Sequence, residues 1–523
     1  MPLYASEWRG TSSQAISHAR MENPRRKRHC WECRRRCLVC DFTEPACRRC
    51  SASGVECPGY SDVKPVKFKW LPLGKVVSRG QGRKKTSKEA ANETTKAITK
   101  LSNEAVLNAD VPISLFNIRT ETYNIAECIE YFNSCIYQGL LPLRELGDNP
   151  HIYPLSAKHL QRASLAPDYL RLGMICMILG HQINRMRGSA ESKRLTERFY
   201  SYWGLSIRSL RDHLDREDRR QGDTVIGGIL TLLLVDVQLG TSLNWRCHLE
   251  GLYKLIMQRG GFEATTRSRV LKPLLRCLWV LVVMGNTTCP ASDILTIGSE
   301  PDTADFLLKQ FREEMSPYHM YPLPLFSDII SVNHLRMCAM QRTNVTTEEL
   351  SQEANRILQH VQDFSPEQWA DSKRSPEDWV LIGRIHQAAV VIYLILSLQS
   401  VSILPMTSGL SAYCATQGKL LQALISTGLS SPKTERFMVW PLIVLGVYAV
   451  HGDLAMRAFV IQQLPNLSCN LGTFVPLTAK QVLESFWDSG ESRWDVCFSK
   501  PYIFTMQIAV DTGKLPHSTR EMH

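Results

Sequence analysis

Residues 30–57 read Cys30-Trp-Glu-Cys33-Arg-Arg-Arg-Cys37-Leu-Val-Cys40-Asp-Phe-Thr-Glu-Pro-Ala-Cys47-Arg-Arg-Cys50-Ser-Ala-Ser-Gly-Val-Glu-Cys57. When Cys37 is set aside, this stretch consists of two halves that each have the spacing C-x2-C-x6-C. The 523-residue chain contains 17 cysteines, and seven of them lie here. The other ten are scattered, mostly in apolar stretches where cysteine is usually a small buried core residue. The repeated spacing therefore marks this segment as the place where the chain carries cysteine chemistry.

Six cysteines in two equal halves predict a metal site. Residues 1–20 lack a continuous apolar stretch, so we expect no secretory signal and a reducing compartment, where cysteine clusters favour metal over disulfides. Zinc takes four ligands in a tetrahedron, so one ion leaves two thiolates unused and two separate ions need eight. Two zinc ions that share two bridging thiolates use all six, and the symmetry of the repeat makes Cys30 and Cys47 the expected bridges. A disulfide-linked module and a one-zinc module are the alternatives. The predicted ligands are Cys30, Cys33, Cys40, Cys47, Cys50 and Cys57.

Basic residues are concentrated around this segment. Residues 1–85 contain 19 Lys and Arg against 7 Asp and Glu, whereas residues 86–523 contain 42 against 43. The formal net charge of +11 therefore arises in the N-terminal part. A basic segment on a nearly neutral body indicates a polyanionic partner, with nucleic acid favoured over an anionic membrane. The run at 25–28 is also typical of a nuclear import signal or a solvated loop. The predicted DNA contacts are Arg25, Arg26, Lys27, Arg28, Arg34, Arg35, Arg36, Arg48 and Arg49.

The segment resembles the six-cysteine binuclear zinc cluster of fungal transcription factors. The resemblance covers residues 30–60, including Arg34 after the second cysteine, Asp41 after the third, Pro45 two before the fourth, and the ending Cys57-Pro-Gly-Tyr60. It implies two zinc ions, with the helix after the first C-x2-C in the DNA major groove and a preference for G/C-rich triplets such as CGG. It also implies a nuclear protein that works with the transcription machinery or co-regulators.

Two positions depart from the family pattern. The residue four after the second cysteine is usually Lys or Arg and contacts bases, whereas here it is Cys37, and the often basic position before the third cysteine is Val39. A cysteine side chain is too short to reach guanine O6 and N7 as Arg does, so we expect phosphate contacts with relaxed or altered base specificity. Alternatively, Cys37 is tolerated because neighbouring residues read the bases. A further alternative is a protein-interaction regulator whose cluster folds without reading bases.

The segment after the cluster is expected to be a basic flexible linker. Glycines at 74, 80 and 82 interrupt any regular element. The larger apolar residues Ile98, Leu101 and Leu107 do not sustain three or four heptads, so no coiled-coil dimer is predicted. A homodimer formed through the large domain stays open. The expected organisation is a disordered N-terminus at 1–24, the zinc cluster at 25–62, the linker at 63–111, a large domain at 112–515 and a tail at 516–523.

The large domain is expected to be all α-helical. Apolar residues recur every three to four positions in stretches such as 128–136 and 249–256, and glycines and prolines fall between such stretches. Residues 388–404 carry no charge, and we expect them to form a buried helix and no membrane span, since similar shorter runs accompany them. Residues 248–261 and 440–446 are similar to parts of the fungal-specific transcription factor domain, which implies a regulatory domain without catalytic residues.

The sequence contains no G-x-S-x-G, H-E-x-x-H, Walker or G-x-G-x-x-G motif, so no enzyme activity is predicted. His248 and His451 are expected to be structural histidines, because no partner stands at ligand spacing. The acidic and aromatic residues 483–488 and 494–495 favour a packed helix over an activation surface. The sequence as a whole predicts a zinc-dependent, sequence-specific DNA-binding transcription regulator.

Overall fold

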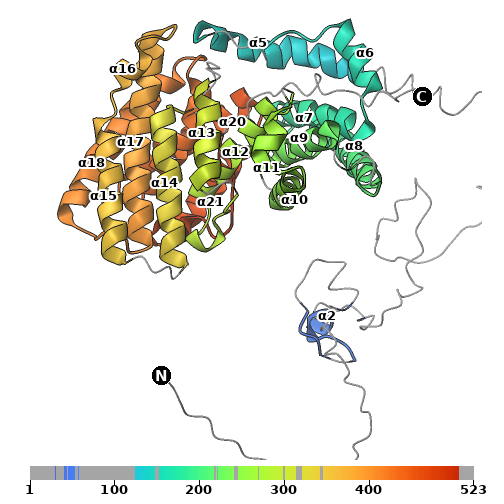
Figure 1. Ribbon diagram of the computed structural model, residues 1–523. Coiled ribbons are helices and arrows are strands. Elements are labelled where there is room, and N and C mark those ends of the chain that lie inside the picture. The colour runs from blue at the N-terminus through green and yellow to red at the C-terminus, as the bar shows by residue number, and fades with distance from the viewer. Residues whose placement is uncertain are drawn as a thin grey trace, which may run out of the picture. The chain divides into compact units, whose positions relative to one another are not determined.

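The computed structural model describes residues 30, 40–43, 45–52, 57, 124–147, 152–216, 220, 222–240, 245–268, 270–297, 301–313, 321–341 and 346–505. The chain divides into two units between Ala109 and Asp110, and each unit is described by itself (Figure 1). The described residues form helices joined by turns and loops, without a strand among them. The expected linker at 63–111 and the expected disordered N-terminus at 1–24 lie outside the described residues.

The first unit is centred on cysteines. Four of them expose at most 2% of their surface, and Phe42 and Cys57 pack against that group. The one helix that the structure describes here is α2, Arg48–Ala52, whose five residues are too few for a stable helix by themselves. A segment this short cannot build a sufficient apolar core, so its fold depends on what the sulfurs bind. The four buried cysteines are Cys30, Cys40, Cys47 and Cys50.

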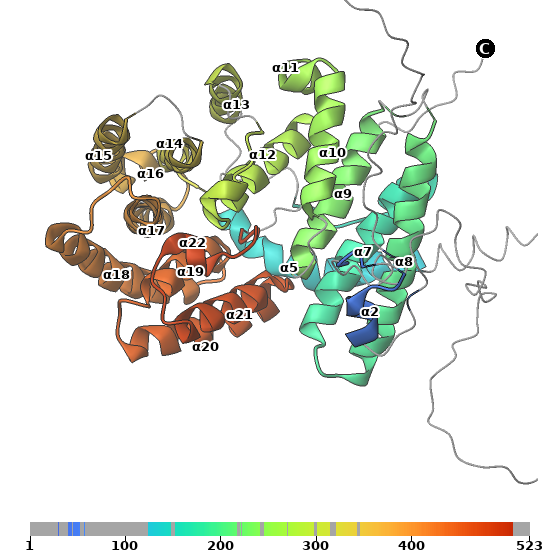
Figure 2. The ribbon, with the colours of Figure 1, turned by 90° about the horizontal axis from the view of Figure 1, so that it is seen from below.

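The second unit is a helical domain, in which α14, α15, α17 and α18 gather on one side and α7 to α10 on the other (Figure 2). Residues 124–131 are also helical. The periodicity expected at 128–136 and 249–256 thus corresponds to helices, and the all-α prediction for this domain is confirmed. The bounds are η1 Phe132–Ile136, α5 Tyr137–Leu140, η2 Leu141–Glu145, α6 Ala157–Leu165, α7 Asp168–Arg185, α8 Ala190–Leu214, α9 Asp223–Leu239, α10 Trp245–Gln258, α11 Gly261–Thr266, α12 Lys272–Thr287, η3 Ala291–Asp293, α13 Pro301–Glu313, α14 Leu323–Met340, α15 Thr347–Asp363, α16 Pro366–Ala370, α17 Pro376–Ser400, α18 Ser408–Leu429, η4 Glu435–Met438, α19 Val439–Tyr448, α20 Leu454–Leu471, α21 Val475–Asp488 and α22 Trp494–Cys497.

Helix α17 lies in the middle of the apolar core. Residues 388–398 expose at most 8% of their surface, and the helix contacts α14, α15, α16, α18 and α19. Among the described residues, α17 is the one helix long and apolar enough to cross a membrane, and 78% of its most apolar window is buried inside the protein. The prediction of a buried core helix is therefore confirmed. The helix ends at Ser400, and Ser402 then takes a φ of 62°, which turns the chain away before Pro405.

The acidic and aromatic C-terminal segment is packed, as expected. Leu483 and Phe486 on α21 are buried, and Trp494 on α22 is fully buried. The Trp494 indole N–H donates to the carbonyl oxygen of Thr287 at the end of α12, at 2.9 Å. Phe486 and Trp494 are thus part of the core and Trp487 packs against it partly buried, which agrees with the expected packed helix.

An ion pair inside the protein fixes α22 to the rest of the domain. Arg336 on α14 is fully buried, and its guanidinium donates to Asp495 Oδ1 at 3.0 Å and to the carbonyl oxygens of Asn286 and Cys289 at 2.7 Å each. The other carboxylate oxygen of Asp495 accepts the backbone N–H of Ala291 at 2.8 Å. Burial acts to lower the pKa of Arg336, but Tyr393, Asp495 and Cys289 outweigh it and hold that pKa above its ordinary value.

Candidate metal centre and nucleic-acid interface

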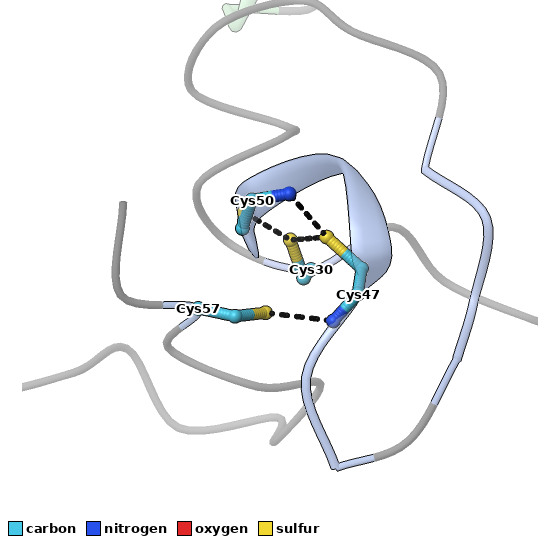
Figure 3. Close-up of side chains that lie close together, drawn as sticks. All are labelled: Cys30, Cys47, Cys50 and Cys57. Carbon is cyan, nitrogen blue, oxygen red and sulfur yellow. Dashed lines mark hydrogen bonds between the residues drawn. The ribbon is translucent and has the colours of Figure 1, made fainter. Parts of the chain in front are cut away.

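Four sulfur atoms converge in the first unit. The Sγ atoms of Cys30, Cys47, Cys50 and Cys57 all lie within 4.8 Å of one another. Figure 3 shows Cys30 Sγ beside two of them, at 3.6 Å from Cys47 Sγ and 3.8 Å from Cys50 Sγ. Both distances far exceed the roughly 2.05 Å of a disulfide. Two sulfurs of a tetrahedral zinc site with Zn–S bonds of about 2.3 Å stand roughly 3.8 Å apart. The group therefore fits the ligand set of one zinc ion.

A second group shares a member with the first. The ligand atoms of Cys40, Asp41 and Cys47 lie within 4.8 Å of one another. Cys47 thus belongs to both groups, which is the position that a thiolate shared between two metal ions would occupy. Cys33, the remaining predicted ligand, lies outside the described residues. The structure brings together five of the six predicted ligands, in two groups that each combine cysteines from both halves of the repeat.

Backbone N–H groups point at the sulfurs. The N–H of Cys50 donates to Cys47 Sγ at 3.3 Å, and the N–H of Cys47 donates to Cys57 Sγ at 3.4 Å. The first turn of α2 positions the Cys50 donor, because the carbonyl oxygen of Cys47 accepts the N–H groups of Cys50 and Ser51.

Asp41 holds the beginning of α2. Its Oδ2 accepts the backbone N–H of Arg48 at 3.0 Å, and its Oδ1 accepts that of Thr43 at 3.4 Å. A carboxylate at a helix N-terminus satisfies an otherwise unbonded N–H and interacts favourably with the helix dipole. In the sequence, Asp41 stands out only as part of the family pattern after the third cysteine, which does not indicate this role. The two partners are seven positions apart, which exceeds the spacing of a local capping motif, so no sequence signal predicted this contact.

The predicted DNA contacts are placed only in part. Arg48 is exposed at the start of α2, next to the buried Cys47. The backbone of Arg49 lies within α2, and nothing is described of its side chain. Cys37 and Val39, which depart from the family pattern, lie outside the described residues. So do the remaining predicted contacts, Arg25, Arg26, Lys27, Arg28, Arg34, Arg35 and Arg36.

The two histidines singled out from the sequence lie in the helical domain. His451 makes a ring contact with Tyr448, with centroids 6.1 Å apart. His248 on α10 has an acidic neighbour that sequence analysis missed, because its Nε2 lies 3.2 Å from Oδ2 of Asp236 on α9. This neighbour stands twelve positions away, so the absence of a partner at ligand spacing in the sequence gave no sign of it. The two residues meet because α9 and α10 pack against each other, which a search for short ligand spacings cannot detect.

Comparisons with known proteins agree with this geometry. A model of the fungal Zn(2)-Cys(6) binuclear cluster domain matches residues 28–66, and a model of the fungal specific transcription factor domain matches residues 154–499. The chain is 46% identical over 499 residues to the phomenoic acid biosynthesis cluster-specific transcriptional regulator of Leptosphaeria maculans. The aligned residues make up 95% of this chain and 92% of the relative. No solved structure matches the chain. The chain therefore belongs to the fungal zinc-cluster transcription factors, DNA-binding regulators whose cluster domain holds two zinc ions.

Proposed function

We propose that this chain is a nuclear transcription regulator, without enzyme activity of its own, that binds double-stranded DNA through residues 25–62. Residues 63–111 act as the linker, and residues 112–515 form the regulatory domain that contacts co-regulators or the transcription machinery. The observation that carries the proposal is the convergence of four cysteine sulfurs within 4.8 Å beside the exposed Arg48. Such a centre organises a segment that presents arginines to a polyanion.

The metal centre of this proposal uses all six cysteines of the repeat. Zinc, when bound, supplies the folding free energy that so short a segment lacks. Cys30 and Cys47 serve as the shared ligands, which agrees with the place of Cys47 in both sulfur groups. The N–H groups of Cys47 and Cys50 stabilise the thiolates, and Asp41 keeps α2 in the orientation that exposes Arg48. The proposed ligands are Cys30, Cys33, Cys40, Cys47, Cys50 and Cys57.

The proposed DNA contacts act mainly on phosphates. Each phosphate that Lys or Arg neutralises releases counterions, so the logarithm of the binding constant falls linearly with the logarithm of salt concentration. The proposed phosphate contacts are therefore expected to make DNA binding steeply salt-dependent. These contacts are Arg25, Arg26, Lys27, Arg28, Arg34, Arg35, Arg36, Arg48 and Arg49.

Replacing Arg48 tests the proposed interface. If Arg48 neutralises one phosphate, Arg48→Ala weakens binding to all duplexes alike and makes the salt slope shallower by about 0.9. Gel-shift titrations of the full chain at several salt concentrations measure this slope. Arg356→Ala is the matched control, because Arg356 is an exposed arginine on the helical domain whose partner is Glu353. Binding that does not change with salt would contradict the proposed function, and an unchanged slope in Arg48→Ala would remove Arg48 from the interface.

Base reading is proposed to be relaxed at the position of Cys37. Arginine at this position can donate two hydrogen bonds to guanine, so Cys37→Arg is expected to sharpen the preference for G/C-rich triplets by about 1–3 kcal/mol. Selection from random duplexes with the full chain measures the preference of both proteins. Cys37→Ser is the control and is expected to leave it unchanged. A wild-type protein that already selects CGG strictly, with no gain from Cys37→Arg, would show that neighbouring residues read the bases.

Cys37 and Val39 also support a second candidate function, that of a protein-interaction regulator with reduced or lost base reading. Equal affinity for all duplexes in the same selection would favour it.

The relative in Leptosphaeria maculans is named a biosynthesis cluster-specific transcriptional regulator, and we propose by this similarity that the present chain also controls a biosynthetic gene cluster. Genome-wide mapping of its bound sites tests this, since bound sites outside such a cluster would contradict it.

A further inference from the structure

The outer face of α8 carries apolar side chains that the domain leaves exposed. The helix contacts α7 and α9, and its inner face contributes the buried Leu195 and Phe199 to the core. In both views α8 lies at an edge of the helical domain (Figures 1 and 2). Of the nine exposed large apolar side chains in the described part of the chain, three lie on this one helix, namely Tyr200, Leu205 and Ile207. Such a concentration on one helix indicates a contact surface.

Part of this outer face forms a stripe that runs along the whole helix. Its residues recur every three or four positions, which is the spacing that brings residues to one face of a helix. All of its members except the central glycine are exposed. Among the described residues, the ion pair that its charged members form is a long one, 3.6 Å between Arg211 and the neighbouring Asp212. We call this face the α8 stripe, and its members are Lys193, Glu197, Tyr200, Gly204, Ile207, Arg208, Arg211 and Asp215.

Gly204 stands in the middle of the stripe. A Cβ atom added there would meet no atom within 4 Å, so the packing of the domain itself does not require a glycine at this position. Glycine inside a helix is destabilising relative to alanine. On an exposed face, however, the absence of a side chain allows another backbone to approach closely. A second helix that crosses α8 at Gly204 would explain the residue.

The charges of the stripe are complementary to those of a second copy of the same stripe. In an antiparallel pair centred on Gly204, a residue before the glycine faces the residue equally far after it in the other copy. Glu197 then faces Arg211 at seven positions from the centre, and Lys193 faces Asp215 at eleven positions. Each contact forms twice, because the twofold axis makes the interface self-complementary. A parallel pair would instead place each charge opposite itself, so the charges favour the antiparallel arrangement.

The remaining members of the stripe fit the same arrangement. Tyr200, which is 61% exposed, faces Arg208 of the second copy, and a guanidinium is attracted to the face of an aromatic ring. Eleven positions span roughly 16 Å of helix, and a crossing angle of about 20° keeps two helices within side-chain reach over that length. We propose that the α8 stripe is the interface of a homodimer, in which α8 of a second copy of this chain packs antiparallel across Gly204.

Charge reversal tests the interface by sedimentation velocity of the full chain without DNA, from nanomolar to high micromolar concentration. Glu197→Lys and Arg211→Glu each bring like charges together at two places, so each is expected to weaken dimerisation about tenfold or more. In an equimolar mixture of the two variants, these contacts again join opposite charges, so the mixture is expected to regain the dimer. Glu263→Lys is the matched control and should dimerise like the wild type. Glu263 is exposed on α11, outside the stripe.

A further pair of variants tests the close approach at the glycine. Gly204→Gln is expected to keep the fold and to weaken dimerisation as strongly as the charge reversals, because two side chains would meet where the backbones approach. Gly251→Gln is its control, since an added Cβ at Gly251 on α10 also meets no atom within 4 Å. The proposal is overturned if the wild type stays monomeric, if any of the three stripe variants dimerises like the wild type, or if the mixture is no more dimeric than its components.

The dimer also has a consequence for DNA, which rests on the proposed function. Two zinc-cluster units on one particle raise each other's effective concentration at a duplex with two half-sites. Gly204→Gln is therefore expected to bind such a duplex more weakly than Gly251→Gln, with the same zinc content. Sedimentation without DNA and gel shifts keep the two proposals separate, because loss of the dimer leaves binding to a single half-site intact, whereas failure of the proposed function leaves the dimer intact.

Discussion

Serine in place of Cys47 is expected to remove both zinc ions from the chain and to abolish DNA binding. Cys47 is the residue common to the two groups of ligand atoms, so its loss deprives both metal sites at once. Serine does not provide the thiolate that zinc prefers in such sites. Structural zinc contributes about 10–16 kcal/mol to the folding of small zinc modules, so the first unit is expected to unfold. Elemental analysis and gel shifts of the full chain measure the two effects.

Two further cysteine variants separate a shared ligand from a terminal one. Cys57 appears in only one of the two groups, so Cys57→Ser is expected to weaken one site and to leave some zinc bound. Cys37→Ser, in the same segment but outside the repeat, is expected to keep two zinc ions per chain. The helical domain should melt at the same temperature in all three variants, because the replaced cysteines all belong to the first unit. Equal zinc contents for Cys47→Ser and Cys57→Ser would contradict the proposed bridging role.

The sequence predicted the metal centre because ligand number and spacing constrain the outcome so strongly. Few arrangements suit a tetrahedral ion when two thiolates are separated by two residues and a third follows after six intervening residues, and this spacing repeats without change. The role of Asp41 could not be predicted in the same way. Its acceptance of the Arg48 N–H depends on the path of the chain between residues 41 and 48, and that path follows from the metal-organised fold.

The helical domain was predictable at the level of its elements. Periodic apolar residues predicted helices such as α10, and the long uncharged run predicted the buried α17. Pairings between distant side chains had no local signal. Asp236 meets His248 only because α9 and α10 lie against each other, and Arg336 meets Asp495 across 159 positions of sequence. Polar residues inside apolar helices are visible in the sequence, but which of them meet is decided by tertiary packing.

The largest loss of stability in the helical domain is expected from Asp495→Leu. Arg336 is fully buried and would keep its charge without its acidic partner, and breaking a buried ion pair in this way costs about 3–5 kcal/mol. The same change leaves the N–H of Ala291 without its acceptor. Urea unfolding of the full chain, followed by far-UV circular dichroism, measures the free energy of unfolding of the domain. Because α22 carries Asp495, this helix is expected to detach first.

The companion variants decide whether the charge pair or the packing of α22 is responsible. Arg336→Met removes the buried cation, so the double variant Arg336→Met with Asp495→Leu is expected to lose less stability than the sum of the single changes. Glu353→Gln is the control, since its ion pair with Arg356 is exposed and is worth about 1 kcal/mol or less. Additive losses in the double variant would show that Asp495 acts through the Ala291 N–H and local packing. If the double variant is more stable than that sum, the unpaired Arg336 guanidinium is the source of the loss. The domain then tolerates this buried charge only because Asp495 on α22 pairs with it.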